Sequence, residues 1–241
     1  MNLISLIWAY INNPLNDFGG HTHDFLLVAL WSIGLSILIG VPLGIIAAQN
    51  RAIAFVATTF SGVGRAIPTI AFFGLAAAIP ALGLFDRSAI IALTLLGIPP
   101  ILLNTIAGLQ GIDSALVEAA RGMGMTFLQR TVRVQLPLVL PIIAAGVRTT
   151  TVQVIATTPL ITFLGLGGYG EYIVGGIGIN TPAGVAQVLA GAIPVLILAV
   201  VAEYGLAAVQ HALTPVGLRK QAAEIIADSA STDAGKGVVA A

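Results

Sequence analysis

Charged residues are scarce in this sequence, and cysteine is absent. Only 8% of the 241 residues are Asp, Glu, Lys or Arg, against about 25% in a typical soluble domain. By contrast, 57% of the residues are hydrophobic, and the mean hydropathy is +1.01. A surface with so few charges would not stay dissolved in water, so the composition predicts an integral membrane protein.

The same shortages exclude several kinds of partner and site. The formal net charge is zero, which argues against a nucleic-acid partner. Without cysteine there is no disulfide framework and no thiolate metal site. The His21-x-His23 spacing suits a metal ion, but no acidic cluster or further histidine supports it. We therefore expect a solvated histidine pair and no metal.

Enzymatic signatures are missing as well. The sequence has no Gly-x-Ser-x-Gly motif, no histidine deep within an expected span to act as a base, and no paired carboxylates on one helix face. It also lacks a phosphate-binding lysine loop, so this chain is not expected to hydrolyse ATP. We expect no catalytic residue and no cofactor. If transport is driven by ATP, the motor is a separate chain.

Long apolar runs predict an all-α fold with about five membrane-spanning helices, since a straight span needs about 20 apolar residues. The expected spans are residues 25–48, 62–80, 88–110, 137–164 and 184–212. A short interfacial helix is expected to end near residue 61 and precede the second span. Residues 1–23 are expected to form an interfacial or outer segment, 24–218 the transmembrane domain, and 219–241 a disordered cytoplasmic tail.

The distribution of basic residues predicts the orientation. With five spans, one side carries Arg51, Arg121, Arg130, Arg133, Arg219 and Lys220, and the other side carries Arg87. Cytoplasmic loops are enriched in Lys and Arg. The N-terminus is therefore expected outside a bacterial or archaeal plasma membrane, and the C-terminus in the cytoplasm.

Residues 113–137 read as two short helices at the cytoplasmic surface, which we call the elbow. Asp113 is a good N-cap, and Glu118 is expected in the first turn or so of the first helix. Gly122 and Gly124 are expected to end that helix. Thr126 followed by Gln129 predicts a capping box for a second helix over 127 to about 135, with Pro137 ending that helix or opening the next.

The elbow also resembles the EAA loop of ABC-importer permeases. The residues that carry the resemblance are Glu118, Ala119, Ala120, Gly124, Leu136 and Pro137. In that family the loop is cytoplasmic, and its first helix docks in a groove of the ATPase subunit. The resemblance spans roughly residues 24–218 and is closest to permeases for glycine betaine, choline, carnitine or proline.

The resemblance implies a type I importer with two permease chains, ATP-binding subunits and an extracytoplasmic substrate-binding protein. The second permease is a further copy or a paralogue. Because only 6% of the residues are aromatic, and aromatic cages bind quaternary ammonium groups, we expect the tight solute site on the binding protein. Alternatives are a permease for methionine or another amino acid, a stand-alone channel or secondary transporter, and an intramembrane enzyme.

The glycine-rich run after the fourth expected span contains Gly165, Gly167, Gly168 and Gly170. A dinucleotide loop requires a preceding strand, so a nucleotide is rejected. Residues 165–183 are expected to be irregular and to form a re-entrant turn. The resemblance implies that this run belongs to the outer loop and gate region of the permease.

Arg148 and Glu203 are charged residues inside expected spans. Each is estimated to lie roughly 17 Å from the cytoplasmic end of its helix. Isolated charges at that depth are costly, so such residues are normally paired or face water. We therefore expect Arg148 and Glu203 to pair, either as a gate or as a structural contact.

Overall fold

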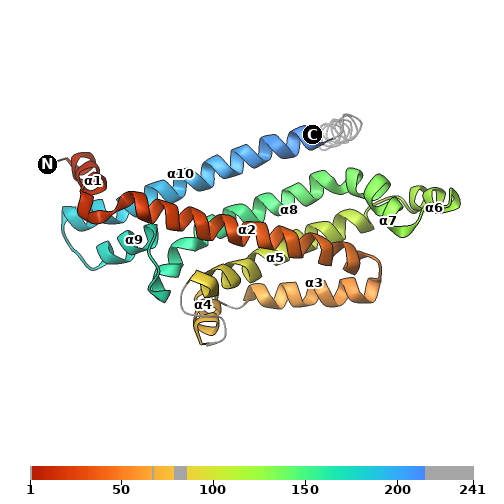
Figure 1. Ribbon diagram of the computed structural model, residues 1–241, viewed down its shortest axis with the longest axis horizontal. Helices are drawn as coiled ribbons and strands as arrows, with labels where there is room; N and C mark the ends of the chain where they lie inside the picture. Colours follow the sequence, from red (N-terminus) through yellow and green to blue (C-terminus); the bar gives the residue numbers. More distant parts are fainter. Residues whose placement is uncertain (1, 67, 79–85, 215–241) are drawn as a thin grey trace, which may run out of the picture.

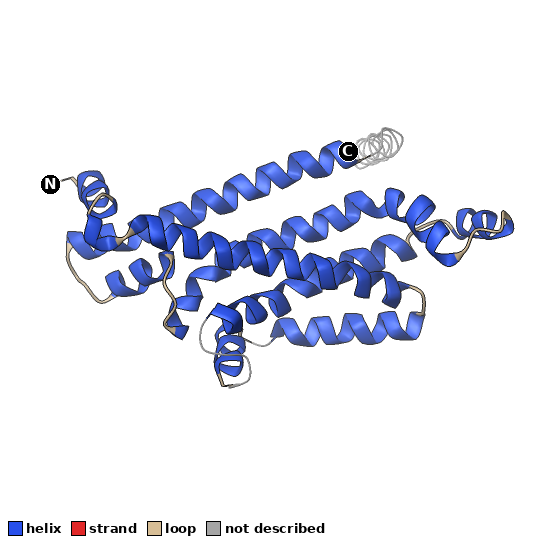
Figure 2. Ribbon diagram, in the orientation of Figure 1, coloured by secondary structure: helices blue, strands red, loops and turns tan. Residues whose placement is uncertain are grey.

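The computed structural model describes residues 2–66, 68–78 and 86–214, and the regular elements within these ranges are helices (Figures 1 and 2). Four long helices form an elongated bundle: α2 (Phe18–Ala48), α5 (Asp86–Gln110), α8 (Leu136–Thr157) and α10 (Pro182–Leu213). Among the described residues, these four regions are long and apolar enough to cross a membrane. The predicted all-α, multi-pass membrane fold is confirmed.

Several of the shorter elements lie toward the two ends of the bundle (Figure 1). α1 (Leu3–Ile11), η1 (Pro14–Asn16) and α9 (Tyr169–Ile177) lie at one end. α6 (Ser114–Gly122), α7 (Phe127–Arg130) and the last described residues of α10 lie at the other. The structure thus separates an elbow end from an outer-loop end, while the orientation in the membrane stays a prediction from charge.

The expected second span at 62–80 is wrong. α3 (Arg51–Ala66) runs back along α2 and α5, and a separate helix α4 follows (Thr69–Ala77). Pro68 explains the break, because proline has no N–H to donate and disfavours helical backbone at the residue before it. The expected interfacial helix ending near residue 61 is corrected too: Ala54 of α3 is buried against Ala47, Leu102 and Ile106 inside the bundle.

α5 packs against α2, α3, α4 and α8, and small residues allow the close crossings. A Cβ added at Gly44 of α2 would lie 2.6 Å from Cβ of Thr105. One added at Gly146 of α8 would lie 3.0 Å from the carbonyl oxygen of Pro100. The Gly40-x-x-x-Gly44 pattern, which predicts close packing, therefore lies at the α2–α5 contact.

Hydroxyl groups inside the bundle donate hydrogen bonds to backbone carbonyls. Ser36 donates to the carbonyl of Ser32 at 2.7 Å and to that of Thr94 across the α2–α5 contact at 3.1 Å. Thr150 of α8 donates to the carbonyl of Gly97 at 2.8 Å. In a membrane, polar groups must be satisfied within the protein, so these bonds join α2, α5 and α8.

Several helix boundaries differ from the sequence predictions. α2 begins at Phe18, seven residues before the expected start at 25, because Asp17 caps it and accepts a hydrogen bond from the Gly20 N–H at 3.2 Å. After α8 the chain narrows into a 3₁₀ helix, η4 (Thr158–Leu164), whose first turn contains Pro159. The predicted tail 219–241 and the domain end at 218 lie outside the described residues.

Candidate functional site

The first helix of the elbow begins and ends as its sequence predicts. Asp113 accepts a hydrogen bond from the Ala115 N–H at 2.9 Å, and α6 runs from Ser114 to Gly122. Gly124 has φ +77° and its N–H donates to the carbonyl of Arg121 at 2.9 Å. Only glycine adopts this left-handed backbone without strain, so the turn requires Gly124. Glu118 is not in the first turn of α6, which is a correction to its expected place.

The second helix of the elbow is continuous with a membrane helix. Thr126 and Gln129 form the predicted capping box, with N–H to oxygen distances of 2.9 and 3.3 Å. α7 then passes through a π-helical turn, η3 (Thr131–Gln135), directly into α8. Pro137 therefore opens α8, and the helix does not stop there. The π turn widens the helix just before a residue that has no N–H to donate.

The two faces of the elbow differ in exposure. Ala120 is 2% exposed, and Leu136 packs beside Leu109 and Val139 of the bundle. Glu118 and Ala119 are exposed, as is Pro137. The structure also leaves large apolar side chains uncovered along the elbow: Leu116, Met123, Phe127 and Leu128. An exposed apolar patch with a carboxylate beside it is typical of a protein-docking surface.

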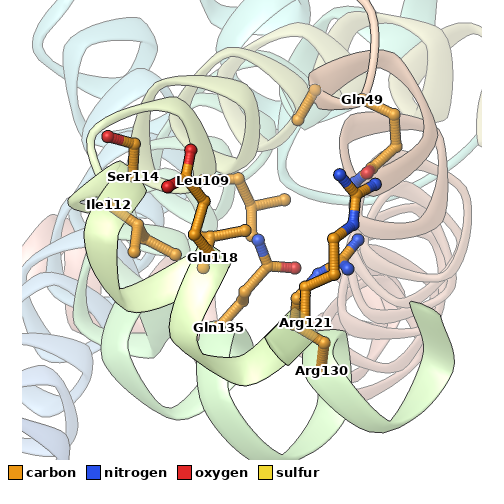
Figure 3. Close-up of a pocket in the computed structure, with 10 residues that line it drawn as sticks. Gln49, Leu109, Ile112, Ser114, Glu118, Arg121, Arg130 and Gln135 are labelled. Atoms are coloured by element: carbon orange, nitrogen blue, oxygen red, sulfur yellow. The ribbon is translucent and has the colours of Figure 1, made fainter. Parts of the chain in front are cut away.

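A cavity of about 330 Å³ lies between the elbow and the ends of α2 and α5. It is lined by Ala48, Gln49, Leu109, Ile112, Ser114, Val117, Glu118, Arg121, Arg130 and Gln135. Figure 3 shows that Arg121 and Arg130 approach one side of this cavity, while Glu118 and Ser114 lie on the other. Sequence reasoning missed this cavity, because it is built from segments far apart along the chain.

Arg148 and Glu203 form the expected ion pair between α8 and α10. Gln210, two turns further along α10, accepts a second hydrogen bond from the Arg148 guanidinium at 3.5 Å. The Arg148 side chain is 34% exposed and that of Glu203 is 36% exposed. Depth along each helix was enough to predict the contact, whereas the contribution of Gln210 was missed.

The glycine-rich run is partly helical, which corrects the expectation of an irregular segment. Gly165 and Gly168 have φ values of +77° and +100°, and α9 starts directly afterwards. A Cβ added at Gly170 would lie 1.8 Å from the carbonyl oxygen of Pro159, so only glycine fits there. Gly167 faces the His21 ring: a Cβ added there would lie 3.1 Å from its Nδ1 atom. Gly165, Gly167 and Gly168 thus form a tight turn beside α2, and Gly170 lies in the first turn of α9 against η4.

Residues in the first turns of α2 hold this glycine-rich turn in place. His21 accepts a hydrogen bond from the Gly168 N–H at its Nδ1 atom, at 2.7 Å, and its Nε2 lies 3.6 Å from the Glu171 carboxylate. Thr22 and the Tyr169 hydroxyl are 2.8 Å apart. His21 therefore has a defined place against the glycine-rich turn, and the expectation that it is a solvated residue is wrong. His23 is exposed and lies beside Asp24.

Tyr172 of α9 adds to these contacts, and we call Tyr172 and its neighbours Tyr10 and Asn16 the tyrosine cluster. Its hydroxyl donates to the carbonyl of Asn16, and its ring meets that of Tyr10 edge-on with centroids 5.4 Å apart. Burial raises the pKa of Tyr172, with nearby Tyr10 and Asp17 adding to the effect. The phenol therefore stays protonated and remains a hydrogen-bond donor. No sequence pattern singled out this cluster, because its partners are far apart in the chain.

Comparisons with known proteins agree with this arrangement. The family described as "Binding-protein-dependent transport system inner membrane component" matches residues 40–214. The choline transport system permease protein OpuBB of Bacillus subtilis (strain 168) is 36% identical over 199 residues, 83% of this chain and 89% of the relative. The carnitine transport permease protein OpuCB of Listeria monocytogenes is 38% identical over 199 residues, with the same coverage. The osmoprotectant import permease protein OsmW of Salmonella typhimurium is 36% identical over 196 residues, 80% of this chain and 89% of the relative.

Solved structures with the same fold come from an ABC transporter. A chain from an inward-facing structure of the MetNI methionine ABC transporter superimposes with a TM-score of 0.70 and 22% identity. The match covers 81% of this chain and 95% of that one. At this identity the likeness shows the fold alone. Together, the family match over most of the chain and the relatives above 30% identity show that this protein belongs to the inner-membrane permease components of binding-protein-dependent ABC transport systems.

Proposed function

We propose that this chain is the permease of an ATP-driven importer for compatible solutes such as glycine betaine, choline, carnitine or proline. The observation that supports the solute class is the 34–38% identity to permeases named for choline, carnitine, glycine betaine or osmoprotectants. A methionine or other amino-acid importer is the alternative, because the fold likeness to the methionine transporter carries no information on the solute.

The proposed division of labour follows from the site. The exposed elbow, with Glu118, Ala119 and Gly124, would dock into a groove of a separate ATP-binding subunit. The turn with Gly165, Gly167, Gly168 and Gly170 would belong to the outer gate, where a substrate-binding protein delivers the solute. A second copy or a paralogue of this permease would complete the pathway. In the described residues, the aromatic rings near α9 pack against one another, so we place tight solute recognition on the binding protein.

Uptake measurements test the solute class. The chain would be produced with its ATP-binding subunit and binding protein in a host that lacks its own osmoprotectant uptake. Labelled glycine betaine, choline, carnitine, proline and methionine would be supplied one at a time. We expect uptake of at least one of the first four and none of methionine. Uptake of methionine alone would replace the proposed function with the alternative.

A pair of glycine substitutions tests the coupling role of the elbow. A Cβ meets open space at both Gly122 and Gly124, but only Gly124 has a positive φ. Gly124→Val therefore strains the turn without a steric clash, and Gly122→Val is the matched control. We expect Gly124→Val to abolish uptake with normal membrane abundance, and Gly122→Val to retain uptake. Equal uptake in the two variants would reject the elbow as the coupling element.

Cysteine labelling tests the proposed orientation. The native chain has no cysteine, so each variant carries one thiol. Ser114, at the elbow end, and Asn180, at the outer-loop end, are both exposed. An impermeant thiol reagent applied to intact cells should label Asn180→Cys and leave Ser114→Cys unlabelled. The reverse pattern would place the elbow outside the cell and remove it from reach of an ATPase.

A further inference from the structure

We infer that Arg148 and Glu203 line the solute pathway and present one charge of each sign to a zwitterionic solute as it passes. This inference rests on the proposed function, which supplies the pathway and the zwitterionic members of the solute class, namely glycine betaine, carnitine and proline; choline carries only the ammonium charge. In this inference the ion pair takes part in the movement of the solute. A purely structural pair would only allow the two helices to insert into the membrane. We call Arg148, Glu203 and Gln210 the charged seam.

The position of the seam sets the first constraint. Glu203 precedes the end of α10 at Leu213 by roughly ten residues, or about 15 Å. Arg148 lies in the interior of α8. Charges at such depth are found where they face protein or water and not lipid tails. Because about a third of each side chain is exposed in the single chain, something other than lipid must cover the seam.

The two faces of α10 show which side meets lipid. Glu203 and Gln210 are seven residues apart and therefore share a face, which looks toward Arg148. Exposed apolar side chains on the far side of α10 suit lipid: Ile197, Val201 and Tyr204. Leu196, seven residues before Glu203 on the same face, is exposed and apolar as well, so the polar stretch of this face runs from Glu203 to Gln210. We infer that this stretch is left for water in the pathway and for the second permease.

The buried side of α8 faces α5 and not the charged seam. Gly146 and Thr150 pack on α5, where Thr150 donates to the carbonyl of Gly97. Arg148 lies between them in sequence and thus on the opposite side of the helix. The guanidinium is therefore turned away from the centre of this chain. The seam lies where two permeases would meet around a shared passage.

The chemistry of the seam fits a solute that carries both charges. A guanidinium offers a planar set of N–H donors to a carboxylate, and a carboxylate attracts a quaternary ammonium group that has no donor of its own. When a zwitterion enters, its carboxylate replaces Glu203 as the partner of Arg148, and its ammonium group replaces Arg148 as the partner of Glu203. The ion pair opens without leaving either charge alone.

Paired substitutions separate passage from structure. The neutral pair Arg148→Leu/Glu203→Leu removes both charges, and the swapped pair Arg148→Glu/Glu203→Arg keeps one of each sign. Uptake of labelled glycine betaine is divided by the amount of inserted complex. We expect the neutral pair to lose about tenfold or more per complex and the swapped pair to stay within about threefold of the parent. Glu118→Gln is the control for the loss of a carboxylate outside the seam. We expect this variant to lower uptake by weakening the coupling to the ATPase, and to leave the rate of thiol labelling in the seam unchanged.

Two outcomes would overturn the inference. Wild-type uptake per complex in the neutral pair would show that the ion pair is structural only. A swapped pair as inactive as the neutral pair would show that the site does not need one charge of each sign.

Thiol labelling tests the seam even if the paired variants fail to insert. Ala207 lies one turn from Glu203 on the same face of α10, and Gly205 lies on the opposite, open face. Each is changed to cysteine in the assembled transporter in proteoliposomes, and a thiosulfonate reagent that carries a trimethylammonium group is applied. We expect Ala207→Cys to react about tenfold faster than Gly205→Cys, either without nucleotide or with vanadate and ATP.

Equally slow reaction of the two cysteines in both states would reject a hydrated seam. A parent transporter that carries no osmoprotectant, while Ala207→Cys still reacts rapidly, would instead reject the proposed solute class. The failure of the inference and the failure of the proposed function are therefore distinguishable.

Discussion

α5 and α10 are both long, apolar helices, but they have different surroundings. In the most apolar stretch of each, 56% of α5 is buried inside the chain against 17% of α10. α5 is enclosed by α2, α3 and α8, whereas α10 runs along the edge of the bundle and leaves it beyond α9 (Figure 1). Hydropathy shows that both helices can cross a membrane. The small and hydroxyl residues where α2 and α8 cross α5 show that α5 is the helix surrounded by its own chain.

The comparison predicts its largest effect at the α2–α5 crossing. Gly44→Leu inserts a side chain where even a Cβ would lie 2.6 Å from Thr105, so the helices must separate, at a cost of about 3 kcal/mol. Gly34→Leu is the matched control in the same helix, because nothing lies within 4 Å of a Cβ there. We expect membrane abundance, measured by immunoblot, to collapse only for Gly44→Leu. Equal abundance would mean that α5 is less tightly enclosed than the structure shows.

The two halves of α10 give the next largest difference. A Cβ at Gly191 would lie 2.5 Å from the carbonyl oxygen of Tyr169, whereas one at Gly205 meets open space. Gly191→Leu should lower the thermal unfolding midpoint in detergent, at a cost of about 2 kcal/mol. Gly205→Leu should leave it nearly unchanged in the isolated chain. A similar loss for both variants would contradict an open half of α10 toward its Leu213 end.

Tyr172→Phe sharpens the comparison at the outer end of α10, where α9 packs. The substitution removes the hydroxyl that donates to Asn16 and leaves the Asn16 carbonyl, which is half-buried, without this donor. We expect a loss of about 1 kcal/mol in the free energy of unfolding. Tyr204→Phe is the control on the exposed face of α10 and should be neutral. Denaturant titration in detergent would measure both, and equal midpoints would show that the N-terminal segment does not stabilise α9.

The smallest effect is expected at the α5–α8 contact. Thr150→Val keeps the shape of the side chain and removes the hydrogen bond to Gly97. Hydrogen bonds between membrane helices average about 0.6 kcal/mol, so the unfolding midpoint should fall slightly. Thr149→Val is the control, because the Thr149 hydroxyl bonds within its own helix, to Ala145. A larger loss for Thr149→Val would contradict the assignment of Thr150 to the interhelical contact.

Local chemistry explains why the elbow was predictable. Asp113, Gly124 and the Thr126–Gln129 pair act within three or four residues, so their spacing alone indicates where each helix begins or ends. The Arg148–Glu203 contact was also predictable, because two opposite charges at similar depth in apolar helices have few alternatives to pairing.

Tertiary contacts explain what the sequence concealed. The Gly168–His21 bond joins residues 147 positions apart, and no local rule links them. α9 was missed because its glycines disfavour a helix, yet Tyr169 and Tyr172 are buried and hold it in place. The second span was misplaced because hydropathy ran through Pro68, where the backbone requires a break.

The capping box, the π turn and α8 form one uninterrupted helical rod with η4, from Phe127 to Leu164. At about 1.5 Å per residue, its 38 residues reach roughly 57 Å. The elbow is therefore joined to the glycine turn at Gly165 by continuous helix, and the π turn near the elbow is a point at which this rod can flex.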